Sequence, residues 1–415
     1  MTILVFFLAT LLWAASGVAG ENWPQFRGPE ANGHADAEGL PLKWSDKENV
    51  VWKTPIHDLG WSSPVIWKDA IWLTTATADG HHSFAVCIDR ASGKLVHDVK
   101  VFDTENPDHI ATSNSYASPT PVVEDGRLYV HYGTYGTACL DTNSGKVLWT
   151  RRDLHCDHHE GPGSSLMLWG KLLIFDVDGR DVQYVIALDK ATGKTAWKTN
   201  RSVDFSKLTT NTHKAFCTPI VIEAGGRLQL VSPGAKAMMG YDPGSGEELW
   251  KVCYGGWSVT PRPLFGHGLI FLVMDYDHPE LWAVRPGGSG DLTGSNVVWK
   301  ITKAVPSRPS LLLIDDLLYM VSSVGIASCV EAKSGHLIWQ QRIGGAYSAS
   351  PIYADGHIYF FNHEGTATVV QPGRKYTVLA VNKLDGEDLM ASPAVAGKAL
   401  FLRTRTDLYR IEKRD

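Results

Sequence analysis

The sequence lacks the short motifs by which common catalytic classes are detected. It contains no Gly-x-Ser-x-Gly, no His-Glu-x-x-His and no phosphate-binding glycine loop ahead of a helix. Long runs of one charge are missing too, because 39 Lys and Arg oppose 44 Asp and Glu for a net charge of −5. Neither a nucleic-acid footprint nor an acidic tail is therefore indicated.

Apolar runs long enough to cross a bilayer are missing beyond the amino terminus. Residues 3–13 are apolar but too short to span comfortably, and small residues follow up to Gly20. We expect residues 1–20 to be a secretory signal, with an uncleaved anchor as the alternative. No Cys lies near the expected cleavage site, so a lipid-modified terminus is not expected. The mature protein is predicted to be periplasmic or secreted.

Glycine and tryptophan are abundant, with 40 and 15 residues, and they mark an internal repeat. The repeat ends in Asp-x-x-x-Gly-x-x-x-Trp or a close variant, at Asp141/Gly145/Trp149, Asp189/Gly193/Trp197, Asp242/Gly246/Trp250, Glu331/Gly335/Trp339 and Asp89/Gly93/His97. It opens on an apolar strand, at Pro64, Pro119, Leu166, Pro219, Pro261, Pro309, Pro351 and Pro393. Seven steps from first to last opening cover 329 residues, a mean period of 47, which is close to one four-stranded propeller blade.

Eight openings predict an all-β, eight-bladed propeller of four-stranded antiparallel blades. The last copy supplies only three strands before the chain ends, whereas Asn49 to Pro55 looks like an outer strand with no inner strands before it. We expect this amino-terminal strand to complete the last blade and close the ring, which removes an open sheet edge. An open solenoid is the alternative. The predicted organisation is a signal at 1–20, a strap at 21–48 and the propeller at 49–415.

The repeat also assigns places to single side chains. The Trp of the ending is expected to pack flat between blades without a polar partner. Cys87, Cys139 and Cys329 each precede the acidic residue of an ending by two positions, so we expect small buried side chains rather than disulfide partners. Cys156, Cys217 and Cys253 stay undetermined.

Insertions at 98–115, 151–164 and 198–215 lengthen connections from an outer strand to the next innermost strand. All should emerge on one face around the channel mouth, where propellers usually bind ligands. Residues 286–296 replace a short turn and are expected to form a peripheral loop.

A set of aromatic and basic residues lies at or just before the strand openings. On one ring, these residues would form a funnel suited to a planar anionic ligand or an acidic protein segment. In the alternative, the aromatic rings seal neighbouring blades and the cations are solvated or paired. The set comprises Trp61, Tyr116, Lys214, Phe216, Trp257, Arg262, Arg308 and Tyr347, with Lys236 as a further contributor.

A cluster of potential metal ligands precedes Gly161. His155, Cys156, His158 and His159 are ligand types that zinc or copper prefers, although their spacing matches no established metal signature. In the alternative, this is a polar rim loop whose His158 and His159 contact a ligand. The acidic pairs Asp176/Asp178 and Asp275/Asp277 could hold calcium or form turn hydrogen bonds.

The Ser-Pro opening, the Asp-Gly hairpin and the Asp-x-x-x-Gly-x-x-x-Trp ending resemble the repeat of the pyrroloquinoline quinone (PQQ)-like propeller family. That family includes the quinoprotein alcohol dehydrogenases and BamB, a propeller of the bacterial outer-membrane assembly machinery. Residues 22–29 look like the leader of many exported bacterial members. The resemblance covers nearly the whole mature chain and implies a fold rather than an activity.

Two differences from these relatives, both in the positions of cysteines, determine which function we expect. The dehydrogenases carry an adjacent Cys-Cys pair beneath their quinone, and this sequence has none. BamB carries a lipidated Cys after its signal, which is also missing here. We therefore expect an exported, noncatalytic propeller that binds a protein segment or a small ligand at its channel face, with no cofactor. The alternative is a quinoprotein-like oxidoreductase using PQQ and calcium, with Trp257 as a stacking floor. Oligomeric state is not predicted.

Overall fold

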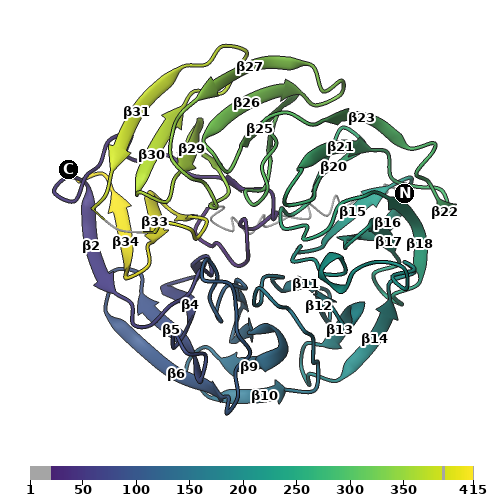
Figure 1. Ribbon diagram of the computed structural model, residues 1–415. Helices are drawn as coiled ribbons and strands as arrows, with labels where there is room; N and C mark the ends of the chain where they lie inside the picture. The colour runs from purple at the N-terminus through teal and green to yellow at the C-terminus, as the bar shows by residue number, and fades with distance from the viewer. Residues whose placement is uncertain (1–19, 386–387, 415) are drawn as a thin grey trace, which may run out of the picture.

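The computed structural model describes residues 20–385 and 388–414, and their strands form eight sheets around a central channel (Figure 1). The predicted signal at 1–20 lies outside these residues except for Gly20. No helix in the described part of the chain is long and apolar enough to cross a membrane.

Each blade runs from an innermost strand at the channel to an outermost strand at the rim. Blades 1 and 2 contain β3 (Val65–Trp67), β4 (Ala70–Ala76), β5 (His82–Asp89), β6 (Leu95–Asp103), β7 (Val122–Glu124), β8 (Arg127–His131), β9 (Thr137–Asp141) and β10 (Val147–Arg151). Blades 3 and 4 contain β11 (Met167–Trp169), β12 (Leu172–Asp178), β13 (Gln183–Asp189), β14 (Thr195–Asn200), β15 (Ile220–Ala224), β16 (Arg227–Pro233), β17 (Ala237–Tyr241) and β18 (Glu248–Cys253).

The second half of the ring repeats this order. Blades 5 and 6 contain β19 (Leu264–Gly266), β20 (Leu269–Met274), β21 (Glu280–Val284), β23 (Val297–Ile301), β24 (Leu312–Ile314), β25 (Leu317–Val321), β26 (Ile326–Glu331) and β27 (Leu337–Arg342). Blades 7 and 8 contain β28 (Ile352–Ala354), β29 (His357–Phe361), β30 (Thr366–Val370), β31 (Val378–Lys383), β32 (Ala394–Ala396), β33 (Ala399–Arg403) and β34 (Asp407–Glu412).

The last blade is completed from the other end of the chain. Strand β2 (Val50–Pro55) pairs antiparallel with β34, with Lys53 opposite Tyr409. The order β2-β34-β33-β32 gives blade 8 its fourth strand. The predicted eight-bladed ring and its closure by the amino-terminal strand are therefore confirmed.

The ending of the repeat is explained by contacts between neighbouring blades. The Oδ1 atom of Asp189 accepts a hydrogen bond from the backbone N–H of Thr192, 2.9 Å away. This hydrogen bond stabilises the turn that leads to Gly193. Gly193 has a φ of +72°, and a Cβ added there would lie 2.7 Å from the ring of Trp149 in the preceding blade. Glycine is thus required both for the turn and for the approach of the indole.

The expectation that these Trp side chains need no polar partner is wrong. Trp149 donates from Nε1 to the backbone oxygen of Lys190, 3.1 Å away, in the turn of the next blade. A buried indole N–H costs free energy unless it finds an acceptor, so the turn supplies one. The same bond recurs at four further tryptophans, namely Trp52, Trp197, Trp299 and Trp339.

The interface between blades 4 and 5 departs from this pattern. Trp250 donates to the side chain of Gln229 inside its own blade, because the insertion at 286–296 replaces the turn of blade 5. That insertion was expected to be a peripheral loop. It lies at the rim, but it also forms β22 (Gly290–Asp291), which pairs parallel with β18 and gives blade 4 a fifth strand.

Three predicted openings are out of register by two residues. The innermost strands start at Val122, Leu264 and Leu312, so their opening residues are 121, 263 and 311 rather than Pro119, Pro261 and Pro309. Each of these segments has a second Pro or Leu two positions later, and the sequence pattern alone does not distinguish the two.

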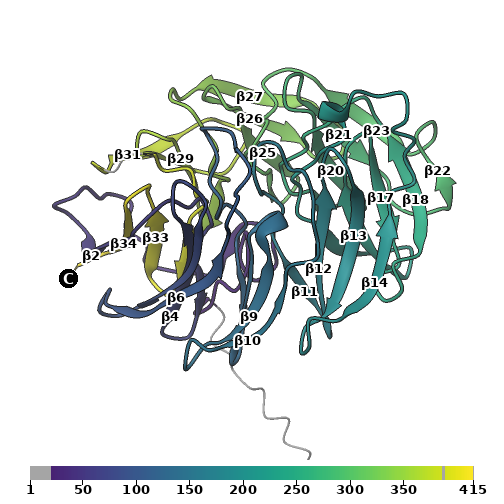
Figure 2. The ribbon, with the colours of Figure 1, turned by 60° about the horizontal axis from the view of Figure 1, so that its bottom comes forward.

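The strap between Gly20 and β2 closes the channel from one face (Figures 1 and 2). Trp23 forms a bridge with Ile66 of blade 1, and β1 (His34–Ala35) pairs parallel with β28 of blade 7. Between them, Arg27 donates to the backbone oxygens of Leu311 and Pro351. The strap therefore contacts the innermost strands of blades that lie far apart in the sequence.

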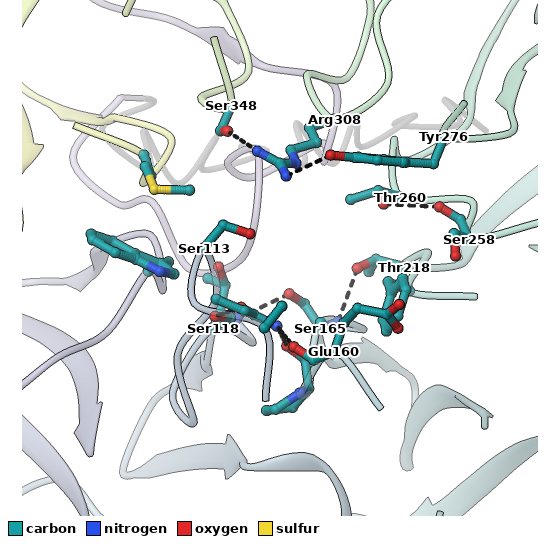
Figure 3. Close-up of a pocket in the computed structure, with 18 of the residues that line it drawn as sticks. Ser113, Ser118, Glu160, Ser165, Thr218, Ser258, Thr260, Tyr276, Arg308 and Ser348 are labelled. Carbon is teal, nitrogen blue, oxygen red and sulfur yellow. Dashed lines mark hydrogen bonds between the residues drawn. The ribbon is translucent and has the colours of Figure 1, made fainter. Parts of the chain in front are cut away.

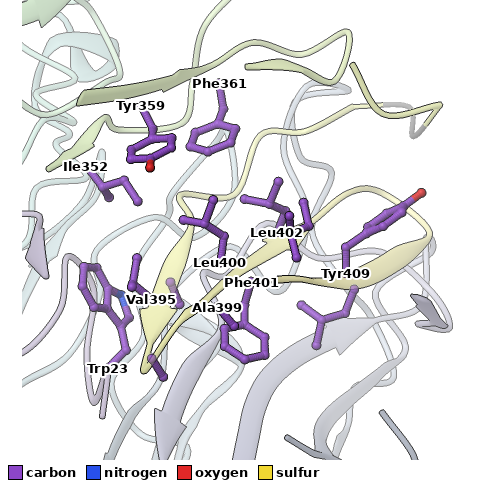
Figure 4. Close-up of a cluster of buried hydrophobic side chains, with 14 of the residues drawn as sticks. Trp23, Ile352, Tyr359, Phe361, Val395, Ala399, Leu400, Phe401, Leu402 and Tyr409 are labelled. Atoms are coloured by element: carbon purple, nitrogen blue, oxygen red, sulfur yellow. The ribbon is translucent and has the colours of Figure 1, made fainter. Parts of the chain in front are cut away.

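The core consists of apolar layers between blades rather than one central mass. One layer joins blades 7, 8 and 1, and Trp23 of the strap is buried in it beside Val395 and Leu400 (Figure 4). The predicted small buried side chains Cys87, Cys139 and Cys329 are indeed buried. All six cysteines are free thiols, including the three left undetermined, Cys156, Cys217 and Cys253.

Candidate functional site

A cavity of about 450 Å³ occupies the channel mouth on the face opposite the strap (Figure 3). Its walls come from connections that lead into the innermost strands, including two of the three long insertions predicted to rim the channel, 98–115 and 151–164. No residue of the third insertion, 198–215, lines the cavity. Phe26 of the strap forms part of its floor. The strap thus contributes to the lining of the cavity, whose size lies within the usual range for small-ligand pockets.

A ring of hydroxyl groups lies at the base of the cavity, one residue before seven of the eight openings. Ser165 shows the pattern, because its Oγ accepts from the backbone N–H of Thr120 at 2.9 Å while its own N–H donates to the Oγ1 of Thr218 at 3.0 Å. Six such bonds of 2.9–3.0 Å link the ring, with Thr120, Ser165, Thr218, Ser310, Ser350 and Ser392 as acceptors. Within the described chain, none of the six hydroxyls donates its own proton to a protein acceptor. Five of them line the cavity and can donate to a ligand.

Aromatic and apolar side chains form the upper walls. Trp61, Phe216, Trp257 and Tyr276 line the cavity together with Met390. The Nε1 atom of Trp61 is buried and has no partner among the described residues, so this indole also offers a free donor. The cavity therefore combines flat apolar surfaces with a base of hydrogen-bond donors.

Arg308 is a cation on the cavity wall held only by neutral oxygens. Its Nη2 donates to the hydroxyl of Tyr276 at 3.0 Å, and its Nη1 donates to the Oγ of Ser348 at 3.4 Å (Figure 3). The guanidinium also lies 5.4 Å from the centre of the Tyr276 ring. In the described part of the chain it forms no ion pair with a carboxylate. These contacts fix its position and leave its charge uncompensated.

Lys214 supports the opposite wall from behind. Its fully buried ammonium group donates to the backbone oxygen of Asn211 at 2.8 Å and pairs with the carboxylate of Glu160 at 3.0 Å. It also lies 4.8 Å from the centre of the Trp257 ring. Burial lowers the pKa of Lys214, and Glu160 opposes that shift. Lys214 thus positions two wall residues rather than lining the cavity itself.

Two buried arginines lie under the floor. Arg262 donates to the backbone oxygens of Phe26 and Pro219, both at 2.9 Å, and burial lowers its pKa to about 10. Arg27 bonds to backbone oxygens nearby, and burial together with the charge of Arg262 lowers its pKa to about 9. Neither forms an ion pair with a carboxylate of the described residues. Buried cations without counterions are costly, so the floor carries a positive field toward the cavity.

The structure separates the predicted ligand-contacting residues into two groups. Trp61, Phe216, Trp257 and Arg308 line the cavity, and Lys214 supports it. The others do not line it: Tyr116 is buried under a loop, Tyr347 is buried between blades, Arg262 lies beneath the floor, and Lys236 donates to the backbone oxygen of Gly255. For these four, the alternative interpretation of sealing and structural pairing is the one the contacts support.

The predicted metal cluster does not converge. Cys156 and His158 lie together, with 3.6 Å between Sγ and Nδ1, whereas His155 and His159 are exposed. His158 accepts the backbone N–H of Thr134 through Nε2, and burial lowers its pKa to about 4. Across the described residues, no three His, Cys, Asp or Glu side chains are arranged to hold a metal ion. The loop reaches the cavity only through Glu160 and the residues that follow it.

The two acidic pairs have different surroundings. Asp178 accepts two bonds of 2.6 Å from Arg201, and Asp176 lies 3.4 Å from the same guanidinium, all fully buried. Asp275 accepts the backbone N–H of Asp277 at 2.9 Å, as a turn residue does. Asp277 itself lines the cavity.

Sequence reasoning missed the hydroxyl ring, which is the largest set of donors in the cavity. The signal was present, because Ser or Thr directly precedes the opening residue at 63, 120, 165, 218, 310, 350 and 392. At Thr120 and Ser310 the pattern was not recognised, because the predicted openings Pro119 and Pro309 lie two residues before the observed ones. Tyr276 and Met390 could not be found this way, since they lie in connections with no common pattern.

These features describe a propeller with a binding cavity on its channel face, and comparison with known proteins places the chain in a family. The family model described as "Outer membrane protein assembly factor BamB" matches residues 45–183 and 181–415. The chain therefore belongs to this BamB family of PQQ-like β-propellers, as its repeat indicated.

Individual relatives in the family and beyond are distant. BamB of Yersinia pestis is 24% identical over 222 residues, which are 49% of this chain and 52% of that protein. The quinohemoprotein alcohol dehydrogenase of Comamonas testosteroni is 31% identical over 183 residues, 41% of this chain and 24% of that enzyme. The 1-butanol dehydrogenase (cytochrome c) of Thauera butanivorans is 29% identical over 145 residues, 31% of this chain and 20% of that enzyme. The chain thus spans about half or less of the curated relatives it matches.

Solved structures show the same fold at low identity. BamB from Moraxella catarrhalis has a TM-score of 0.60 at 11% identity, covering 87% of this chain and 99% of that one. A europium-containing methanol dehydrogenase has a TM-score of 0.68 at 9% identity, covering 93% and 90%. A computationally designed protein, Ika8, scores 0.60 at 12% identity, covering 86% and 99%. Likeness at this level shows the fold alone.

The residues of the cavity do not fit a quinone held with a calcium ion. A calcium ion requires several converging oxygen ligands, and no group of three such acidic side chains exists among the described residues. Trp257 offers a flat ring, but the buried Lys214 ammonium lies over it. We therefore derive no redox step at this site.

Proposed function

We propose that this protein is a noncatalytic binding propeller whose channel cavity takes the carboxylate of a small planar ligand or of a protein segment. The observation that carries the proposal is Arg308, a fixed guanidinium on the cavity wall with no carboxylate partner in the described chain. Arginine binds carboxylates through two N–H groups at once, and three of the five N–H groups of Arg308 make no hydrogen bond within the described residues.

Two further features support an anionic ligand. The hydroxyl ring offers protons that the protein does not use, and the buried Arg27 and Arg262 add positive charge below the floor. The aromatic walls would enclose a flat apolar group next to the carboxylate. We further propose that the protein acts outside the cytoplasm, in keeping with its predicted signal and its family.

Titration calorimetry with N-acetyl-L-phenylalanine tests the proposal, because this probe joins one carboxylate to one planar ring. We expect heat of binding in the wild type, and its loss in Arg308→Met. Exposed Arg285, outside the cavity, provides the matched control Arg285→Met, which should bind like the wild type. Equal binding by all three proteins, or none by the wild type, would overturn the proposal.

The distant dehydrogenase relatives name a second candidate, a quinoprotein-type oxidoreductase, which the poor fit of the cavity residues to PQQ and calcium opposes. It predicts alcohol-dependent dye reduction when PQQ and calcium are added to the purified protein. If neither PQQ nor calcium raises the unfolding temperature of the purified protein, this candidate fails.

A further inference from the structure

A second cavity adjoins the first on the same face of the ring. It has a volume of about 550 Å³ and lies between blades 5 and 6, where the connections 275–279, 302–311 and 322–325 meet. Asp277 lines both cavities, and Ser307 of the second cavity directly precedes Arg308 of the first. The two spaces therefore adjoin one another between Asp277 and Arg308.

The second cavity, which we name the blade 5–6 groove, has an apolar side and a polar side. Val324 is 63% exposed at its edge, and Val305 and Ile326 lie beside it. Ser322 and Ser323 line the other side, where Ser323 bonds to Ser307 with 2.7 Å between the hydroxyl oxygens. An apolar ligand side chain that covered Val324 would remove this surface from water.

The junction has the charges that the end of a peptide needs. Arg308 offers a cation to a terminal carboxylate, as the proposed function requires. The carboxylate of Asp277 makes no ion pair within the described residues and can accept a backbone N–H of the same peptide. Capture of a carboxyl terminus by fixed donors is an established mode of peptide recognition, in which neighbouring grooves then select side chains.

We propose that the site binds the free carboxyl-terminal end of an extended polypeptide. The terminal carboxylate would lie on Arg308 in the channel cavity, and the residues before it would run along the blade 5–6 groove with an apolar side chain against Val324. This inference rests on the proposed function, because it assigns the same cation to the same kind of anion. Beyond the proposed function, it specifies that the ligand is a polypeptide and states in which direction its chain runs through the site.

Two synthetic pools of hexapeptides test the inference. Both contain the same randomised sequences, but one ends in free carboxylates and the other in amides. Each pool is passed over immobilised full-length protein, and retained peptides are counted by mass spectrometry. We expect the free-acid pool to be retained at least tenfold over the amide pool, with Val or Leu enriched before the terminal residue. Arg308→Met should abolish the difference between the pools, and Val324→Glu should lower retention of the free acids and remove the enrichment.

The outcomes separate the two proposals. If N-acetyl-L-phenylalanine binds as tightly as the best free-acid hexapeptide and Val324→Glu changes nothing, the groove is not used. The peptide inference then fails while the carboxylate-binding function stands. If neither the acid pool nor N-acetyl-L-phenylalanine is retained, both fail. Circular dichroism and thermal unfolding of each variant exclude loss of folding, which surface positions such as Val324 should not cause.

Discussion

Arg262 donates from Nη1 to the backbone oxygen of Phe26, 2.9 Å away, and so links the propeller to the strap that closes its channel. Arg262 occupies the position that Ser or Thr holds in the other ring contacts, and its own N–H still donates to Ser310. The ring is therefore interrupted by a side chain long enough to reach across the channel. This exchange adds one anchor for the strap to those made by Trp23, Arg27 and β1.

Arg262→Ala should destabilise the protein by about 2–4 kcal/mol. The substitution leaves the carbonyl groups of Phe26 and Pro219 buried without donors and opens a void under the floor. Guanidinium denaturation measures the loss, and Arg285→Ala at the exposed surface should stay within about 0.5 kcal/mol of the wild type. An equal effect of both substitutions would show that the strap contact contributes nothing.

Gly28→Ala should loosen the strap. Gly28 has a φ of +83°, and an added Cβ would lie 2.7 Å from the ring of Trp23. Gly126→Ala is the matched control, because its φ is +74° but nothing lies within 4 Å of the added atom. Both changes carry backbone strain, whereas Gly28→Ala adds overpacking of about 1–3 kcal/mol. Faster proteolytic cleavage near the strap in Gly28→Ala alone is expected, and identical cleavage in the two variants would contradict this account.

The buried cluster of Asp176, Asp178 and Arg201 should make stability depend on pH. Burial raises the pKa of Asp176 to about 7, opposed by Arg201 and reinforced by Asp178. In the unfolded chain this carboxyl group titrates near pH 4, so between about pH 4 and 7 the folded state binds the additional proton. Its contribution to stability is fully present below pH 4 and is lost as the pH rises through about 7.

Asp176→Asn keeps the shape of this side chain and removes its titration. We expect the free energy of unfolding, measured by denaturation at pH steps from 4.5 to 8, to fall less steeply with pH than in the wild type. Asp178→Asn serves as comparison, since it disrupts the two 2.6 Å bonds to Arg201 and should cost about 3–5 kcal/mol at every pH. Parallel curves for the wild type and Asp176→Asn would assign the proton to another group.

The substitution Thr218→Val tests how much one hydrogen bond of the hydroxyl ring contributes to the free energy of unfolding. Valine fills nearly the same space but cannot accept the buried N–H of Ser165, now bonded at 3.0 Å. We expect a loss of about 1–2 kcal/mol. Thr112→Val, at an exposed position in the cavity-rim loop, should change stability by less than about 0.5 kcal/mol. If Thr218→Val also binds N-acetyl-L-phenylalanine more weakly than the wild type, the hydroxyl group of Thr218 donates a hydrogen bond to the ligand.

The fold was predictable from the sequence because its determinants are local and repeated. Gly193 and Trp149 belong to different blades, yet four of the five endings named above carry both a Gly and a Trp at these positions, so the same contact between blades recurs around the ring. The cavity was only partly predictable, because Trp61 and Arg308 lie at repeat positions while Tyr276 does not. Arg262 was misassigned since its sequence position is that of a cavity residue, and only the crossing strap determines where its guanidinium goes.

The pairing of β2 with β34 has a consequence for the order of folding. The outermost strand of the last blade is synthesised before any other blade, and its partner comes last. No intermediate of the growing chain can therefore have a sealed ring, and β2 has no partner strand while some 350 further residues are synthesised. Pairing of β2 with β34 closes the ring in a single step, so deleting either strand should convert unfolding from one cooperative transition into a blade-by-blade one.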